Sequence, residues 1–314
     1  MTIYVLRRVS GVVPVLILVA LGSFLLVHLV PGDPAMVMLG SDATPQQIQS
    51  LRTQMGLDRS LPEQFLIWMR QALRGDLGES FFLGRPVTQA LMERLPATMQ
   101  LAMLSLFFSL LIGVPAGILA SVRQNSRWDQ LVMITAMGGI SIPSFWLGLF
   151  LILVFSVNLG WLPSGGYVPI WEEFGPGLRV LILPAISLGF MQAALIARMT
   201  RSSMLEVLRQ DYVRTAKAKG LGWWSVTLRH ALKNAMIPVI TTIGTAFGVL
   251  LGGAVIVEIV FTYPGLGRLV VLAVQRRDYP LVQGALLLTS VIYVAVNLAV
   301  DLLYSVFDPR IKYE

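Results

Sequence analysis

The amino-acid sequence predicts an all-α membrane protein with six transmembrane helices, cytoplasmic termini and a long outer segment between the first two helices. Composition is the first reason, because apolar residues make up 55% of the 314 residues and charged residues only 13%. Length is the second, since apolar runs recur along the chain and each can cross the ~30 Å of hydrocarbon in a bilayer. The placement of lysine and arginine is the third, and it sets the orientation.

The apolar runs place the six helices in order along the chain. The first follows Arg7 and Arg8 and is longer than a signal-peptide core, without a small-residue cleavage site, so we expect it to be retained. Pro143 and Pro184 fall inside later runs, where they are expected to kink the helices. The predicted spans are 9–30, 98–121, 131–157, 178–198, 236–260 and 282–304.

Basic residues determine which side each connection takes. They gather at the N-terminus, in the second and fourth connections and in the C-terminal tail, which share one side if six spans exist. The 158–177 connection on the other side has no Lys or Arg, but the 261–281 connection disagrees by carrying Arg268, Arg276 and Arg277. Topology accounts for most of the net charge of +7, so we expect contact with membrane lipids and no binding of nucleic acid.

Sequence patterns that would give the chain its own chemistry are missing. No Gly-Lys pair occurs, so no P-loop can cradle the phosphates of ATP. The two histidines, His28 and His230, lie on different segments and form no zinc-binding pattern, and the absence of cysteine excludes disulfides. The chain is therefore predicted to be no enzyme, to bind no cofactor or metal, and to depend on another chain or an ion gradient for energy.

A charged island at 199–234 separates two apolar runs. Gly220 is expected to end a helix there, and Ser225 to start a second short helix. Such a helical plug could enter a groove on a partner, with the small Ala216 and Gly220 allowing close approach. Alternatively, an amphipathic helix could lie on anionic lipid, with Trp223 and Trp224 as anchors. One apolar helix face is predicted from residues at helical spacing: Leu205, Leu208, Tyr212 and Ala216.

This island resembles the EAA loop of ABC importer permeases, in the form found in the dipeptide, oligopeptide and nickel branch. The match runs from 211 to 221 (Asp-Tyr-Val-Arg-Thr-Ala-Lys-Ala-Lys-Gly-Leu) and from 230 to 238 (His-Ala-Leu-Lys-Asn-Ala-Met-Ile-Pro). The general family pattern has Glu-Ala-Ala at positions 214–216, where this chain has Arg-Thr-Ala. It also has proline at position 233, where this chain has Lys233. The segment 308–311 is similar to the first permease subunit of the branch. Together with it, the further segments that extend the resemblance are 31–34, 74–78, 94–98, 141–148, 258–267 and 277–280.

The resemblance implies a type I ABC importer permease fold in a bacterial inner membrane. It implies transport of di- or oligopeptides by alternating access, with nickel chelates, glutathione or other peptide-like solutes as alternatives. The implied partners are a second homologous permease subunit in a heterodimer, two ATPase subunits that bind ATP and Mg, and a periplasmic or lipid-anchored solute-binding protein. An ion-driven secondary transporter and a non-transporting scaffold or sensor are the rival interpretations.

Two groups of site residues follow from the same resemblance. Those expected to couple the chain to the ATPases, in the 203–233 loop, are Tyr212, Arg214, Thr215, Ala216, Lys217, Gly220 and His230. Those expected to line a substrate pathway or outer gate are Glu258, Phe261 and Tyr263. An intramembrane carboxylate normally faces water or the helix bundle, and a structural hydrogen bond from Glu258 to the 261–267 turn is the alternative.

Four segments are predicted along the chain. Residues 1–30 form the N-terminus and first span, and 31–97 form a periplasmic helical segment with helices at 46–54 and 63–73. This segment either guides substrate and docks the binding protein or packs against the partner permease. Residues 98–304 form the permease domain with the coupling loop 199–235, and 305–314 form a cytoplasmic tail.

Overall fold

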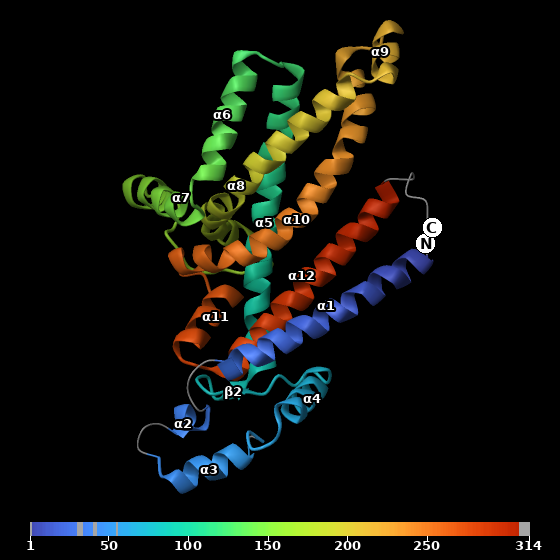
Figure 1. The fold of residues 1–314 in the computed structure, drawn as a ribbon. Helices are drawn as coiled ribbons and strands as arrows, with labels where there is room; N and C mark the ends of the chain where they lie inside the picture. Colours follow the sequence, from blue (N-terminus) through green and yellow to red (C-terminus); the bar gives the residue numbers. More distant parts are fainter. Residues whose placement is uncertain (1, 30–33, 40–42, 55, 308–314) are drawn as a thin grey trace. The chain divides into compact units, whose positions relative to one another are not determined.

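A computed structural model describes residues 2–29, 34–39, 43–54 and 56–307 (Figure 1). The resembling segments at 31–34 and 308–311, and the predicted tail 305–314, lie wholly or partly outside these residues. The chain forms two compact units. One comprises Met1–Pro96 with Arg268–Ala295, and the other comprises Ala97–Gly267 with Val296–Glu314.

Four helices in the described part of the chain are long and apolar enough to cross a membrane. They coincide with the second, fourth, fifth and sixth predicted spans, and α1 (Thr2–Leu29) carries a shorter apolar stretch, Ser10–Leu26, at the position of the first. The four are α5 (Val87–Val122), α8 (Phe174–Leu208), the helix Ser225–Val260, and Tyr279–Ala299 of α12 (Tyr279–Phe307). The helix Ser225–Val260 consists of the π-helical segment η2 (Ser225–Leu232) followed by α10 (Lys233–Val260).

The third predicted span is broken rather than straight. α6 (Arg127–Ser141) meets the helix formed by α7 (Ser144–Leu151) and η1 (Ile152–Asn158) at an angle of 103°. Pro143 confirms the predicted kink, because a proline disfavours helical backbone at the preceding residue and cannot donate to the helix. The span predicted at 131–157 is thus broken at the kink, and counting the bent pair as one crossing gives at most five full-length candidates among the described residues.

The first unit contains helices and one short hairpin. α3 (Pro45–Gln54) and α4 (Leu61–Ala72) confirm the two helices expected in the outer segment, while α2 (Pro34–Leu39) was not predicted. The hairpin of β1 (Glu79–Ser80) and β2 (Arg85–Pro86) is a small departure from the all-α prediction. Aromatic side chains join α1 to α4, since the ring of Phe24 lies 5.4 Å from that of Phe65 and 6.1 Å from that of Trp68.

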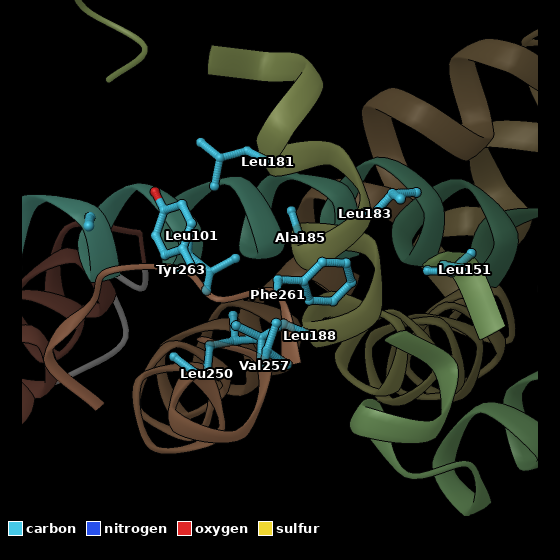
Figure 2. Close-up of a cluster of buried hydrophobic side chains, with 12 residues drawn as sticks. Leu101, Leu151, Leu181, Leu183, Ala185, Leu188, Leu250, Val257, Phe261 and Tyr263 are labelled. Atoms are coloured by element: carbon cyan, nitrogen blue, oxygen red, sulfur yellow. The ribbon is translucent and has the colours of Figure 1, made fainter. Parts of the chain in front are cut away.

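The second unit is built around α8 and α10, which pack against each other, while α6 and α7 pack on α8. Its core is a cluster of buried side chains from α5, α8, α10 and the turn after α10 (Figure 2). Glycines allow α5 and α8 to approach closely: a Cβ at Gly113 or Gly117 would lie 2.7 or 2.5 Å from a carbonyl oxygen of α8. Small residues at helix contacts are typical of membrane proteins.

Candidate functional site

The α9 corner, residues 209–224, joins α8 to the helix that contains α10. α8 ends at Leu208, and Gln210 is extended (φ −69°, ψ 147°) before α9 (Asp211–Ala218) begins. Figure 1 shows α9 beyond the ends of α8 and α10. Because no single helix runs through the corner, the predicted continuous apolar face is wrong. Its proposed members are Leu205, Leu208, Tyr212 and Ala216.

A small apolar cluster holds α9 in place. Val213 and Ala216 are buried and pack with Val226 of η2, and Val207 and Leu208 of α8 pack against them. Ala216 is only 7% exposed. Its small side chain therefore serves packing inside the corner, which corrects the expectation that it gives a partner close access.

Gly220 ends α9, as predicted. Its φ of 78° lies in the left-handed region that favours glycine. The N–H of Gly220 donates to the carbonyl oxygen of Lys217 (3.0 Å), and the N–H of Leu221 donates to that of Ala216 (3.4 Å), the pair of bonds of a Schellman motif. A Cβ here would meet no atom within 4 Å, so the requirement for glycine is conformational rather than steric.

The other predicted coupling residues of α9 are exposed: Tyr212, Arg214, Thr215 and Lys217. The hydrogen bond from Thr215 Oγ1 to the carbonyl oxygen of Asp211 (2.9 Å) is local to the helix. So is the ion pair of Arg214 with Asp211 (3.4 Å), whose side chains are 76% and 95% exposed. Exposed pairs of this kind contribute little to stability. α9 therefore presents charged groups on its surface.

The helix after the corner is longer than predicted. η2 continues into α10, so the prediction of a separate short helix from Ser225 is wrong. His230 of η2 is half-buried. The Tyr212 hydroxyl donates a hydrogen bond to the carbonyl oxygen of His230 (3.5 Å). The same hydroxyl accepts a hydrogen bond from Asn234 Nδ2 (2.7 Å). The two tryptophans before η2 are exposed, with ring centroids 4.7 Å apart. Tyr212 thus ties α9 to the helix that follows it.

Polar contacts that were not predicted from the sequence join the last turns of α8, before the α9 corner, to neighbouring helices. Arg201 of α8 binds Asp129 of α6 through two bonds, Nε to Oδ1 (2.5 Å) and Nη2 to Oδ2 (2.7 Å). The same carboxylate accepts the N–H of Asn125 (2.9 Å). Ser203 Oγ donates to the carbonyl oxygen of Ala235 (2.8 Å), which joins α8 to α10. These bonds join the last turns of α8 to α6 and α10, just before the α9 corner.

The Glu258 corner, residues 258–266, lies at the other end of α10. Glu258 is completely buried, and its Oε1 accepts a hydrogen bond from Thr98 Oγ1 (2.6 Å). The same hydroxyl oxygen accepts the N–H of Leu266 (2.8 Å), so Thr98 bridges the carboxylate to the turn. The N–H of Tyr263 donates to the carbonyl oxygen of Glu258 (2.8 Å). This geometry agrees with the alternative expected for Glu258, a structural bond to the turn, made here through Thr98.

The two other predicted gate residues are buried as well. Phe261 is 1% exposed and Tyr263 0%, and both belong to the core cluster in Figure 2. Phe261 fills space left by Gly148, where a Cβ would lie 2.9 Å from its ring. The Tyr263 ring meets Tyr167 edge to face at 5.3 Å, and burial raises the pKa of the Tyr263 phenol, so it stays neutral. None of the three predicted gate side chains reaches the surface of the chain.

Two residues that shape the Glu258 corner were not singled out from the sequence: Thr98 of α5, which bonds to it, and Gly265 within it. A Cβ at Gly265 would overlap the Glu258 carboxylate, so only glycine fits there. Both residues lie in resembling segments, at 94–98 and 258–267. Their positions in resembling segments could have drawn attention to both residues. The sequence gives no indication that the two segments are in contact.

The structure therefore assembles two separate groups instead of one site. The helix Ser225–Val260, which comprises η2 and α10, has 36 residues, and at about 1.5 Å per residue it separates the two corners by ~54 Å along its axis. Within the described part of the chain, no cluster of three or more His, Asp or Glu side chains suits a metal ion. The geometry fits mechanical connection between two ends of a helix better than chemistry at one centre.

Two family patterns match the chain. Residues 113–313 match the binding-protein-dependent transport system inner membrane component, and residues 1–102 match the N-terminal region of such membrane components. A relative from Brucella abortus (strain 2308), whose name assigns it to a peptide transport system as a permease, is 45% identical and covers 100% of both chains. The glutathione transport system permease protein GsiC of Shigella flexneri serotype 5b (strain 8401) is 46% identical over 99% of both chains.

A solved structure supports the fold. An inward-facing conformation of the MetNI methionine ABC transporter matches with a TM-score of 0.59 at 19% sequence identity. The match covers 70% of this chain and 97% of that chain. At this identity the likeness concerns the arrangement of helices.

Proposed function

The chain belongs to the family of binding-protein-dependent transport system inner membrane components, and from this membership we propose that it carries di- or oligopeptides across a bacterial inner membrane. It is a multi-pass permease subunit and not an enzyme, so ATP hydrolysis belongs to partner subunits. The names of its relatives, which refer to peptide and glutathione transport systems, support a peptide-like solute. Glutathione and nickel chelates are the alternative solutes.

We propose six crossings with both termini in the cytoplasm and residues 31–97 in the periplasm. Contacts between distant connections support this arrangement. Arg201 and Asp129 join the second and fourth connections, both predicted inside. Ser80 and Asp278 join the 31–97 segment to the 261–281 connection, both predicted outside. Each pair must share one side of the membrane, as the proposed topology requires.

The observation that carries the coupling proposal is the surface of α9. This helix exposes Arg214, Thr215 and Lys217, while Val213 and Ala216 hold it against its own chain. A helix seated in this way can transmit a push from an ATPase directly to α8 and, through η2, to α10. Alternating access then follows from rigid movement of helices between two arrangements. Ala216 and Gly220 contribute by fixing the shape of the corner, and His230 by bonding to Tyr212.

The Glu258 corner is proposed to act in the outer gate as a packed block. Glu258, Phe261 and Tyr263 are buried in the chain, so they set the position of the turn rather than bind solute in this conformation. A block of this kind moves as one body when α10 moves. The gate then opens by displacement of the corner as a whole.

The proposed assembly contains a second homologous permease subunit, two ATPase subunits holding ATP and Mg, and a solute-binding protein. The missing P-loop supports this division, since the chain cannot bind ATP by that route. A heterodimer is proposed because the sequence resembles the first of two permease subunits in its branch. The binding protein delivers solute to the outer side.

Uptake by proteoliposomes that contain this chain with its co-purifying partners tests the proposal. Labelled dipeptides, longer peptides and nickel are offered with and without ATP and an external binding protein. We expect uptake of peptide that requires both additions. Uptake that is indifferent to ATP and collapses with an ion gradient would favour the secondary transporter, and ATPase-bound complexes without any uptake would favour the scaffold.

A further inference from the structure

One outer connection is an exception to the charge rule that orients the chain. Lys and Arg normally gather on the cytoplasmic side, yet the 261–281 connection, proposed to lie outside, carries Arg268, Arg276 and Arg277. Two of these arginines occupy the turn between α11 (Leu266–Gln275) and α12. Membrane topology gives no reason to keep positive charge there.

The carboxylate next to these arginines is engaged elsewhere. Asp278 is completely buried, and its Oδ2 accepts hydrogen bonds from Ser80 Oγ (2.5 Å) and the N–H of Phe82 (3.0 Å). Its Oδ1 accepts the N–H of Leu281 (3.3 Å) at the start of α12. Asp278 thus fixes the β1–β2 hairpin to the turn, and its charge is directed into these bonds.

Arg276 and Arg277 are exposed, and no carboxylate pairs with either among the residues that the structure describes. Arg276 lies over the ring of Phe82, with its Cζ 4.8 Å from the centroid, which is a cation–π arrangement. Phe82 is itself 46% exposed. These three residues form one surface, the arginine corner, which combines positive charge with an aromatic ring. Arginine and aromatic residues are the types enriched in protein interfaces.

The backbone at Arg277 is unusual for a residue with a side chain. Its φ of 54° is left-handed. Arg277 N–H donates to Val274 (3.2 Å) and Asp278 N–H to Ala273 (2.9 Å), a Schellman motif whose left-handed position usually holds glycine. Gly220 takes this position in the α9 corner. An arginine is strained where glycine is not, and such outliers cluster at functional sites.

We infer that the arginine corner is a docking surface for an acidic patch on the solute-binding protein. The inference rests on the proposed function, which supplies the partner and places the corner outside. Exposed positive charge that is not neutralised by its own chain attracts an acidic surface and speeds encounter. The hairpin bonds of Asp278 hold Phe82 and Arg276 in register, so the surface is preorganised for the partner.

Charge reversal tests the inference in assembled proteoliposomes of phosphatidylcholine. The solute-binding protein that supports wild-type uptake is titrated, and ATP hydrolysis is measured. For Arg276→Glu with Arg277→Glu, the concentration giving half-maximal stimulation should rise about tenfold, more at low ionic strength, with an unchanged maximal rate. Arg277→Gly relieves strain, so its thermal stability should equal or exceed wild type while its half-maximal concentration still rises.

Arg179→Glu near the start of α8 changes the charge by the same amount as Arg277→Glu alone. It alters an exposed residue outside both the arginine corner and the 31–97 segment, so these two single variants are the matched comparison. An unchanged half-maximal concentration in the double variant would overturn the inference and leave the proposed function standing. An equal rise of the half-maximal concentration in Arg179→Glu and Arg277→Glu would show a general electrostatic effect and would also overturn the inference. An effect that appears only when anionic lipid is added would assign the arginines to lipid headgroups. Wild-type complexes that no binding protein stimulates would overturn the proposed function itself.

Discussion

The α9 corner and the Glu258 corner lie at the two ends of the helix Ser225–Val260. Both reverse the backbone in the same way, but the side chains of one are mostly exposed and those of the other are buried. Gly220 (φ 78°) and Thr262 (φ 51°) both adopt left-handed backbone, each in a Schellman pattern of hydrogen bonds. In the α9 corner, most side chains of α9 are exposed. In the Glu258 corner, Glu258, Phe261 and Tyr263 are buried.

The difference teaches that local backbone geometry does not determine what a corner does. At Gly220 no atom lies within 4 Å of an added Cβ, so the surface is open to a partner. At Gly265 an added Cβ would overlap a carboxylate, so the corner is closed by its own chain. Stability should therefore depend on the Glu258 corner, and coupling to the ATPases on the α9 corner.

The largest loss of stability is expected from Gly265→Ala. The new Cβ would displace the buried Glu258 carboxylate from Thr98, and overpacking of this kind costs about 3 kcal/mol. Thermal unfolding of the purified protein in detergent measures the effect. Gly252→Ala in α10 is the control, because a Cβ there meets nothing within 4 Å and its stability should not fall. Equal stability of the two variants would show that the Glu258 corner is not tightly packed.

Removal of the carboxylate should have the next largest effect. Glu258→Ala leaves the buried Thr98 hydroxyl without its acceptor and should cost about 2 kcal/mol. Glu258→Gln retains an acceptor oxygen and should cost less, with unchanged solute affinity and transport rate. Comparison of the two variants by unfolding and by uptake checks this. A strong transport defect in a stable Glu258→Gln variant would instead assign the carboxylate to the solute pathway.

A larger side chain in the small apolar cluster of the α9 corner should lower the stability less than removal of the Glu258 carboxylate does. The residues around this cluster are exposed and can move to make room. Ala216→Leu would press on Val213 and Val226, with an expected cost of about 1.5 kcal/mol and a lower ratio of solute moved to ATP hydrolysed. Ala218→Leu places the same side chain on an exposed position of α9 and should leave the ratio close to wild type. If Ala218→Leu were the more damaging change, the partner surface would lie on that face.

The smallest cost in stability is expected at Gly220. Gly220→Ala meets no steric conflict, so only the left-handed backbone penalises it, by about 1 kcal/mol. Gly220→Asn should cost less, since Asn tolerates this region. Gly220→Asp should uncouple ATP hydrolysis from uptake while the chain stays in the membrane. Normal uptake by Gly220→Asp would argue against coupling through α9.

Membrane thickness made the helices predictable, because any crossing needs a long apolar run. The run at 131–157 looked like one span, yet Pro143 and the extended backbone before it break the helix by 103°. The β1–β2 hairpin gave no signal, since strands of two residues are too short to show an alternating pattern. Sequence therefore located the apolar segments but not their shape.

The candidate site was predictable where its residues are neighbours in the chain. The glycine at the end of α9 follows from turn chemistry, and the structure confirms Gly220. The apolar face was wrong because Gln210, an unusual residue at a helix start, interrupts the periodicity. The Thr98–Glu258 bond joins residues 160 positions apart, and a single sequence carries no record of such contacts.

The ratio of peptide transported to ATP hydrolysed, in proteoliposomes with the binding protein, tests the contrast between the corners most directly. Arg214→Glu with Lys217→Glu changes only exposed side chains of α9, and Glu258→Gln changes only the buried corner. The account predicts that the ratio collapses in the first variant and stays at the wild-type value in the second. A wild-type ratio in the α9 variant, with collapse in Glu258→Gln, would contradict it.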